Sequence, residues 1–123
     1  MNKAEETVRG YLAAMERRDL AAAKAFLAPG FFMVFRGGVR FDSLEALVEW
    51  ARSRYRSARK TYERFDAYDA GVYCSGTLYG EFLDGTPYSG IRFIDRFTVR
   101  DGKLVDQMVW NDMAEAKAPG KPA

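Results

Sequence analysis

The sequence contains no histidine and only one cysteine, Cys74. Without histidine the chain cannot build the usual catalytic triads, a histidine general base, the common zinc sites or a histidine-ligated haem. A single cysteine excludes an internal disulfide and is typical of a reducing compartment. Cys74 is expected to be a small buried residue, because nothing in the sequence supplies a base to activate its thiol. We therefore expect no metal and no redox cofactor.

Long apolar runs are also absent. No stretch approaches 18 apolar residues, and the first six residues are polar, so neither a membrane span nor a signal peptide is predicted. The formal net charge is only +2, which does not indicate a polyanionic partner such as nucleic acid. A basic run between Arg52 and Arg64 is interpreted as a solvated face, since acidic residues follow it closely. These features predict a cytoplasmic protein that binds no nucleic acid and no membrane.

The chain has enough hydrophobic residues to form one core, since they make up 48% of its 123 residues. We predict a single domain over residues 1–115 and a flexible tail over 116–123. Helices are expected over 4–17, 20–27 and 43–57, and strands over 31–35, 60–68 and 72–83 and on both sides of Asp101-Gly102. This order predicts an α+β fold, a cone-shaped barrel in which three N-terminal helices pack on a strongly curved, mainly antiparallel sheet.

Residues 90–112 are predicted to form a hairpin around a tight turn at Asp101-Gly102, where both residues tolerate a positive φ. A two-residue turn pairs Asp95 with Met108 and puts alternate residues on one core face. That face would carry Ile91, Phe93, Asp95, Phe97, Val99, Leu104, Asp106, Met108, Trp110 and Asp112. The opposite face would include Arg92, Ile94, Arg96, Val105, Gln107 and Val109. Desolvation by the apolar neighbours is expected to keep the Asp95 carboxyl neutral.

The strand over 72–83 is expected to pair with the first strand of this hairpin. If Asp84-Gly85 is a two-residue turn, Cys74 lies opposite Asp95, and Gly76 lies opposite Phe93. Pro87 cannot donate a ladder hydrogen bond, so a bulge there would shift this register.

Three segments, VRGYLAAMERRDLAAAKAFLAPG, FIDRFTVRDGKLV and VWND, resemble the nuclear transport factor 2-like superfamily and in particular its SnoaL-like polyketide-cyclase branch. The resemblance covers about residues 4–115 and implies the cone-shaped fold with a pocket at its mouth. It does not select an activity, because the superfamily contains isomerases, cyclases, hydrolases, dehydratases and non-enzymatic binders.

Ketosteroid isomerases of this superfamily have a tyrosine and a protonated aspartic acid that form an oxyanion hole, and Tyr11 and Asp95 match these positions. The general-base aspartate of those isomerases falls near Phe35, where this sequence has no carboxylate, which argues against steroid isomerisation proper. The Arg-x-Asp pair of the limonene-epoxide-hydrolase-like branch is absent from residues 72–82. The last-strand aspartate of that branch resembles Asp112.

The resemblance leaves two hypotheses. The first is a cofactor-independent isomerase, cyclase, hydrolase or lyase-like enzyme for a carbonyl-bearing, apolar or aromatic ligand, with Tyr11 and Asp95 as oxyanion donors and Asp112 as the base. The second is a non-catalytic ligand-binding or dimeric assembly module of the same fold. A neutral Asp95 beside an apolar pocket favours the enzyme, and a salt-bridged Asp95 in a filled core favours the module.

Seven further residues are expected to line either the pocket or the core, and the sequence does not separate these two: Met15, Trp50, Cys74, Phe93, Phe97, Met108 and Trp110. Asp95 is equally consistent with a buried acid that has a hydrogen-bond partner, and Asp112 with an exposed strand end. Tyr11 lies on an apolar helix stripe, where a tyrosine is more often a core residue than a catalytic one. Because the opposite sheet face mixes apolar and polar residues, we expect a homodimer formed through it.

Overall fold

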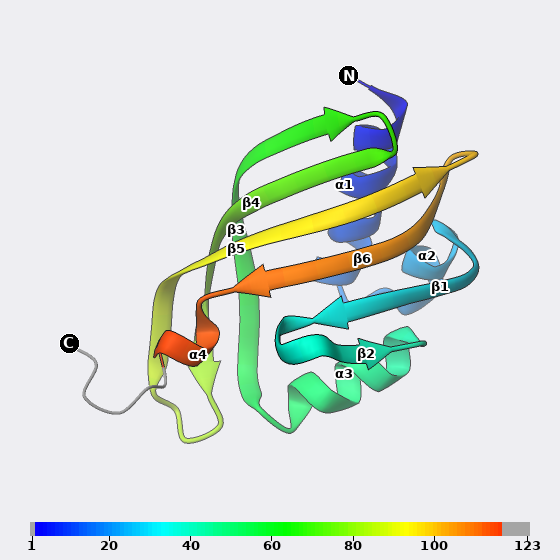
Figure 1. Cartoon of the computed structure of the whole chain (residues 1–123). Coiled ribbons are helices and arrows are strands. Elements are labelled where there is room, and N and C mark those ends of the chain that lie inside the picture. The colour runs from blue at the N-terminus through cyan, green and yellow to red at the C-terminus, as the bar shows by residue number, and fades with distance from the viewer. Residues whose placement is uncertain (1, 117–123) are drawn as a thin grey trace.

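The computed structural model describes residues 2–116, which form four α-helices and one curved, unclosed six-stranded sheet (Figure 1). In chain order the elements are α1 (Lys3–Glu16), α2 (Leu20–Lys24), β1 (Leu27–Phe35), the 3-10 turn η1 (Arg36–Gly38), β2 (Val39–Phe41), α3 (Leu44–Arg52), β3 (Tyr55–Tyr68), β4 (Gly71–Phe82), β5 (Pro87–Arg100), β6 (Lys103–Asn111) and α4 (Met113–Ala116). The α+β class predicted from the sequence is confirmed.

The strands are ordered β2-β1-β6-β5-β4-β3 across the sheet. The β1 and β6 strands are parallel and every other neighbouring pair is antiparallel. In Figure 1 the viewer faces the sheet, with α1 and α2 behind it and α3 below. The core therefore lies between the helices and one face of the sheet, which we call the inner face, and the outer face points away from the helices.

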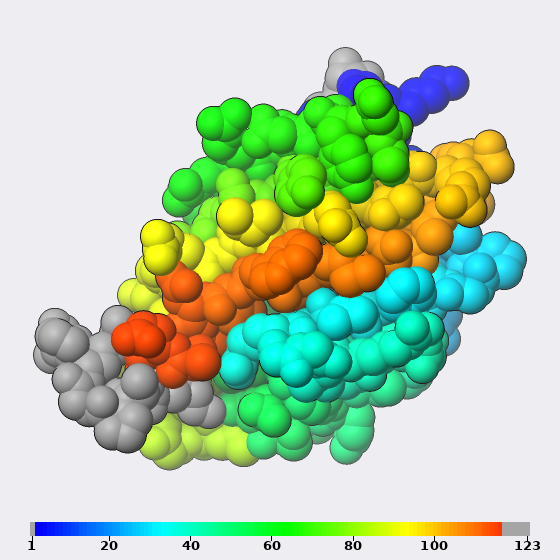
Figure 2. Space-filling model, in the orientation of Figure 1, coloured from blue at the N-terminus to red at the C-terminus, as the bar shows by residue number. Residues whose placement is uncertain are grey.

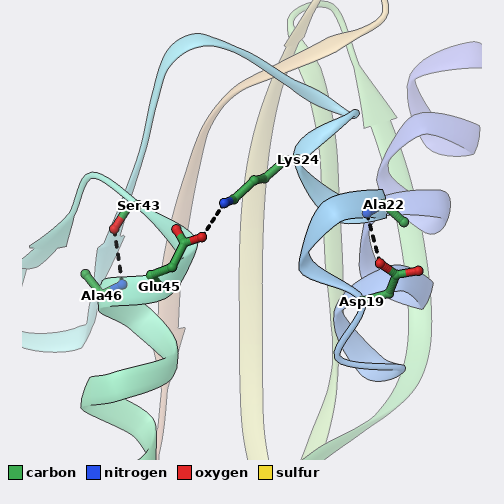
Figure 3. A network of polar contacts seen from close by, with 6 residues as sticks. All are labelled: Asp19, Ala22, Lys24, Ser43, Glu45 and Ala46. Atoms are coloured by element: carbon green, nitrogen blue, oxygen red, sulfur yellow. Dashed lines mark hydrogen bonds and ion pairs between the residues drawn. The ribbon is translucent and has the colours of Figure 1, made fainter.

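Side-chain caps start the second and third helices. Asp19 accepts a hydrogen bond from the backbone N–H of Ala22 at 3.0 Å and so caps α2. Ser43 accepts one from the N–H of Ala46 at 3.1 Å and so caps α3 (Figure 3).

An ion pair between Lys24 and Glu45 joins the end of α2 to the first turn of α3 (Figure 3). The hydrogen bond from Lys24 lowers the pKa of the Glu45 carboxyl. Both side chains are exposed, so this pair orients the two helices more than it stabilises them.

The predicted pairing of the β5–β6 hairpin is wrong beyond its turn. Val99 pairs with Leu104 but Thr98 pairs with Asp106, so Val105 is an extra residue in a β-bulge. One extra residue reverses the parity of everything that follows it in β6. Asp95 therefore lies opposite Val109, not Met108.

The inner face of β6 consequently carries Gln107 and Val109, which are both buried, although both were predicted to lie outside. Trp110 is 52% exposed and Met108 is half-buried, although both were predicted to lie inside. The face assigned to β5 is correct, because Asp95 is buried and Arg92 is exposed.

The predicted β4–β5 register is confirmed at the positions that matter for the core, where Cys74 pairs with Asp95 and Gly76 with Phe93. The turn itself is longer than predicted, since the N–H of Phe82 donates to the carbonyl of Thr86. A register shift between the Gly80–Tyr88 and Leu78–Ile91 pairs compensates for the longer turn. Beyond this shift the residues of β4 and β5 pair as predicted.

Several boundaries differ from the prediction. The third helix ends at Arg52 rather than near Ser57, and the next strand begins at Tyr55 rather than at Lys60. In β3, apolar and polar residues alternate poorly along the sequence. Register shifts beside Tyr55 and Tyr62 explain this irregular pattern. Of the predicted tail, 116–123, only Ala116 is described, and it ends α4; the remainder lies outside the described residues.

We expect Gly76→Ala to destabilise the fold by about 2 to 3 kcal/mol, because overpacking at a fixed backbone forces it to shift. A Cβ at this position would lie 1.9 Å from the carbonyl oxygen of Thr61 on β3. Ser75→Ala, next to it on the same strand, is the matched control and should change stability by no more than about 0.5 kcal/mol. Urea unfolding measures both, and equal midpoints for the two variants would contradict the close strand approach.

Candidate functional site

A cavity of about 570 Å³ lies between α1, α3 and the inner face of the sheet. Its volume is in the range of small-molecule sites in proteins. Most of its wall is apolar, from Leu12, Met15, Leu20, Phe35, Leu47, Val48, Trp50, Leu78, Phe93, Val109 and Met113. An apolar wall of this size suits a ligand with a largely hydrocarbon body.

The polar centre of the cavity is an ion pair between Lys60 on β3 and Asp95 on β5, with 2.7 Å between Nζ and Oδ2. Gln107 on β6 adds a longer contact, donating from Nε2 to the same oxygen at 3.4 Å. The other carboxylate oxygen, Oδ1, is buried and has no hydrogen-bond partner within residues 2–116. Buried carboxylate oxygens usually have a hydrogen-bond partner, so Asp95 Oδ1 is an exception among the described residues.

Strand register explains how a lysine on β3 reaches an aspartate two strands away. Lys60 pairs with Leu78 on β4, whereas Asp95 pairs with Cys74 on the same strand. Between these two β4 positions on the inner face lies Gly76, which has no side chain. The lysine stem therefore crosses β4 over Gly76 to reach the carboxylate.

The lysine is the more accessible member of the pair. Its side chain is 26% exposed, whereas the Asp95 side chain is fully buried. Lys60 Nζ also lies 4.9 Å from the ring centroid of Phe93, whose electron-rich face attracts the cation.

Electrostatics keep Lys60 protonated. Burial lowers the pKa of the Lys60 amine, but the charge of Asp95 and its hydrogen bond act in the opposite direction, and the net pKa is raised. The amine is thus a permanent cation near neutral pH and not a nucleophile. The sequence placed no cation beside the Asp95 carboxyl, whereas the structure pairs it with Lys60.

Two tyrosines lie close to this ion pair and keep their hydroxyl protons. Burial raises the pKa of Tyr11, on α1, despite the nearby charge of Lys60. Burial likewise raises the pKa of Tyr62, on β3, to about 12. Both phenols line the cavity, and Tyr11 is held in place by an edge-on contact with Phe97 at 6.1 Å between ring centroids. Two phenol groups and one ammonium group therefore line the same cavity.

The structure brings five of the ten predicted site residues to the cavity wall, namely Tyr11, Met15, Trp50, Phe93 and Asp95. Two others, Cys74 and Phe97, are buried in the core without lining the cavity. The remaining three, Met108, Trp110 and Asp112, do not line it either. The Val105 bulge explains why Met108 and Trp110 lie on the outer face, away from the cavity. Asp112 pairs with Arg92, with 2.6 Å between Oδ2 and Nε, near the end of the sheet.

Sequence reasoning missed Lys60, Tyr62 and Gln107. Lys60 and Tyr62 alternate along β3 toward the inner face, and this period of two was present in the sequence. The surrounding arginines concealed it, because the whole basic run was interpreted as one solvated face. Gln107 had no such signal, since the bulge that turns it inward leaves no clear mark in the sequence.

A model of the SnoaL-like domain family matches residues 8–107 of the chain. The chain belongs to this family. No curated protein matches the sequence. Within residues 2–116 no helix is long and apolar enough to cross a membrane, and no group of three or more potential metal ligands lies together.

Solved structures share the fold at low sequence identity. An NTF2-like protein of unknown function from Burkholderia pseudomallei K96243 is 21% identical, with 94% of this chain and 95% of that chain covered and a TM-score of 0.85. TerC, in a structure co-crystallised with polyporic acid, is 18% identical over 94% and 95% of the two chains, with a TM-score of 0.84. A protein from Jannaschia sp. CCS1, described as a candidate SnoaL-like polyketide cyclase, is 17% identical over 98% and 94%, with a TM-score of 0.79.

We expect Lys60→Met to destabilise the fold by about 3 kcal/mol, because it leaves a buried carboxylate without its cation. The double variant Lys60→Met/Asp95→Leu should recover most of this loss, since an apolar pair can replace a buried ion pair at little cost. Chemical denaturation of the wild type, the single variant and the double variant provides the measurement. A double variant less stable than Lys60→Met alone would show that Asp95 is held by other groups.

Proposed function

We propose that this protein binds an apolar, carbonyl-bearing small molecule and catalyses proton transfer at the carbon next to the carbonyl group. The observation that carries the proposal is the meeting of a buried carboxylate, a lysine ammonium and a tyrosine hydroxyl at one apolar cavity. Family membership and the fold neighbours, one described as a candidate polyketide cyclase and one co-crystallised with polyporic acid, are consistent with such a ligand.

Asp95 is the base in this proposal. It is the only fully buried carboxylate in residues 2–116, Lys60 and Gln107 contact its Oδ2, and its Oδ1 has no hydrogen-bond partner in those residues. In this proposal Oδ1 takes the proton. A positioned base of this kind typically contributes about 10²- to 10⁴-fold to the rate.

Lys60 and Tyr11 are the oxyanion donors. When the proton passes from the carbon to Asp95, the electron pair moves onto the carbonyl oxygen, and a fixed cation and a phenol donor stabilise the resulting enolate. Return of the proton to another carbon gives isomerisation, and attack of the enolate carbon on a second carbonyl gives cyclisation. Both outcomes use the same three side chains, so the ligand decides between them.

A non-catalytic binding module is the second candidate. The specific observation in its favour is that Asp95 is already paired with Lys60 at 2.7 Å, as expected of a structural acid. In that case Lys60 would recognise a ligand oxygen, and the ligand would leave the cavity unchanged.

Exchange of the α-protons of 2-tetralone, an apolar ketone that enolises, separates the two candidates. In D₂O the wild-type protein should accelerate deuterium incorporation over buffer, followed by proton NMR. Asp95→Asn should lower the accelerated rate by about 10²- to 10⁴-fold through loss of the base. Tyr11→Phe should lower it by about 10²- to 10³-fold through loss of one oxyanion donor.

Asp112→Asn is the matched control, because it makes the same chemical change outside the cavity. Its exchange rate should equal that of the wild type. Exchange that is lost in Asp112→Asn but retained in Asp95→Asn would assign the base to Asp112 and overturn the proposal. Binding of 2-tetralone without any acceleration would favour the binding module.

We also propose that the outer sheet face pairs with a second copy of the chain. This face, turned toward the viewer in Figure 2, includes the large exposed hydrophobic residues Tyr73 at 38%, Ile94 at 49% and Trp110 at 52%. The same face holds Arg96, whose Nε is buried and lacks a partner in the described residues. An apolar surface of this kind is usually covered by another protein surface.

Light scattering at micromolar concentration should give the mass of a dimer for the wild type. Ile94→Asp should give a monomer, because a charge would be buried at the interface. Val39→Asp, at an exposed apolar residue on β2, is the control and should remain dimeric. A monomeric wild type would contradict this pairing without affecting the cavity.

A further inference from the structure

The charged residues around the cavity are unevenly distributed. Its wall includes six cationic side chains but only two carboxylates, an excess of four positive charges, whereas the whole chain has a formal net charge of only +2. The cations are Arg18, Arg36, Arg52, Arg56, Arg59 and Lys60, and the carboxylates are Glu16 and Asp95. Positive charge is therefore concentrated where a ligand would bind.

Three of these cations have acidic partners. Lys60 pairs with Asp95 at 2.7 Å, and Arg59 lies 3.8 Å from Glu16. Arg52 lies 3.6 Å from Glu49, which does not line the cavity. The fixed charge of these three groups is thus at least partly compensated within the protein.

Arg18, Arg36 and Arg56 have no carboxylate partner within residues 2–116. Arg18 donates to two backbone carbonyls and Arg56 to one, at distances of 2.8 to 3.3 Å. Arg36 has only a long contact, 3.4 Å from its Nη2 to the hydroxyl oxygen of Tyr55. Neutral acceptors position these guanidinium groups; the charge of Arg56 also acts on the Asp84 carboxyl, whose pKa is lowered mainly by hydrogen bonds from Thr86.

Arg36 has the most suitable environment for an anion. It is half-buried in η1 and lines the cavity beside the aromatic side chains of Phe35 and Tyr55. A guanidinium group in a partly apolar setting binds a carboxylate through two parallel hydrogen bonds, and such bonds are stronger there than in open water. The exposed residues Arg18 and Arg56 line the same cavity from its solvent side and add to the positive field.

We infer that the ligand of this cavity is an amphipathic carboxylate, with its apolar body against the cavity wall and its carboxylate on Arg36. The inference rests on the proposed function only in requiring that the cavity bind an apolar molecule, and it does not depend on catalysis. A carbonyl oxygen at Lys60 and a carboxylate at Arg36 would fix the ligand at two points and so determine which carbon faces Asp95.

The test compares three probes of nearly equal shape by calorimetry: 2-naphthoate, its neutral amide 2-naphthamide, and 2-naphthyl phosphate. The wild type should bind 2-naphthoate at least about 10-fold more tightly than 2-naphthamide, as expected for hydrogen bonds to a charged group. Added salt should weaken the binding of 2-naphthoate and leave that of 2-naphthamide nearly unchanged.

Arg36→Met keeps an unbranched, largely apolar stem and removes the charged guanidinium group. It should abolish the preference for 2-naphthoate by weakening that probe about 10-fold while leaving 2-naphthamide unaffected. Arg100→Met is the matched control, because it removes the same charge from an exposed site at the end of β5, outside the cavity. The Arg100 variant should keep the full preference.

Each other outcome is decisive. Equal affinity of the wild type for 2-naphthoate and 2-naphthamide, or a preference that survives Arg36→Met, would overturn the inference while leaving the proposed function intact. Tighter binding of 2-naphthyl phosphate than of 2-naphthoate would overturn the assignment to a carboxylate. If none of the three aromatic probes binds, the apolar binding cavity itself, and with it the proposed function, is refuted.

Discussion

The ion pair between Lys60 and Asp95 is the interaction on which the site depends. Asp95 lies at the centre of the inner sheet face, where an ionised carboxylate without a cation would be too costly to bury. The long side chain of Lys60 supplies that cation from β3, at a register where Gly76 leaves β4 without a side chain between the two residues. The 2.7 Å contact between Lys60 and Asp95 thus depends on the register of β3, β4 and β5 and on the glycine at position 76.

Local patterns in the sequence were sufficient for the fold and for half of the site. Alternation along β4 and β5 correctly placed Cys74 opposite Asp95. The turn has one residue more than predicted, but a register shift between Gly80 and Leu78 cancels the effect of that residue. The same reasoning failed on β6, where the Val105 bulge has no compensation. Both faces of β6 carry apolar residues, so its alternation does not show where the parity changes, and Gln107 was assigned to the wrong face.

The basic run shows a different limit of sequence reasoning. Arg56, Arg59 and Lys60 were grouped as one solvated surface, although strand geometry sends their side chains to different places. Lys60 is directed to the buried acid, and the arginines remain more exposed at the same cavity. Charge counted along the chain could not reveal this, because the partner of Lys60 lies 35 residues away in sequence.

The chemistry open to the site follows from the strength of this pair. Asp95 raises the pKa of Lys60, which removes the lysine as a base or nucleophile and leaves it as a fixed positive charge. The same contact uses one carboxylate oxygen and leaves Oδ1 without a partner in the described residues. An oxygen of a bound ligand that accepts a hydrogen bond from Lys60 would compete with Oδ2 for the ammonium protons. Binding of such a ligand would then loosen the contact between Lys60 and Asp95 Oδ2.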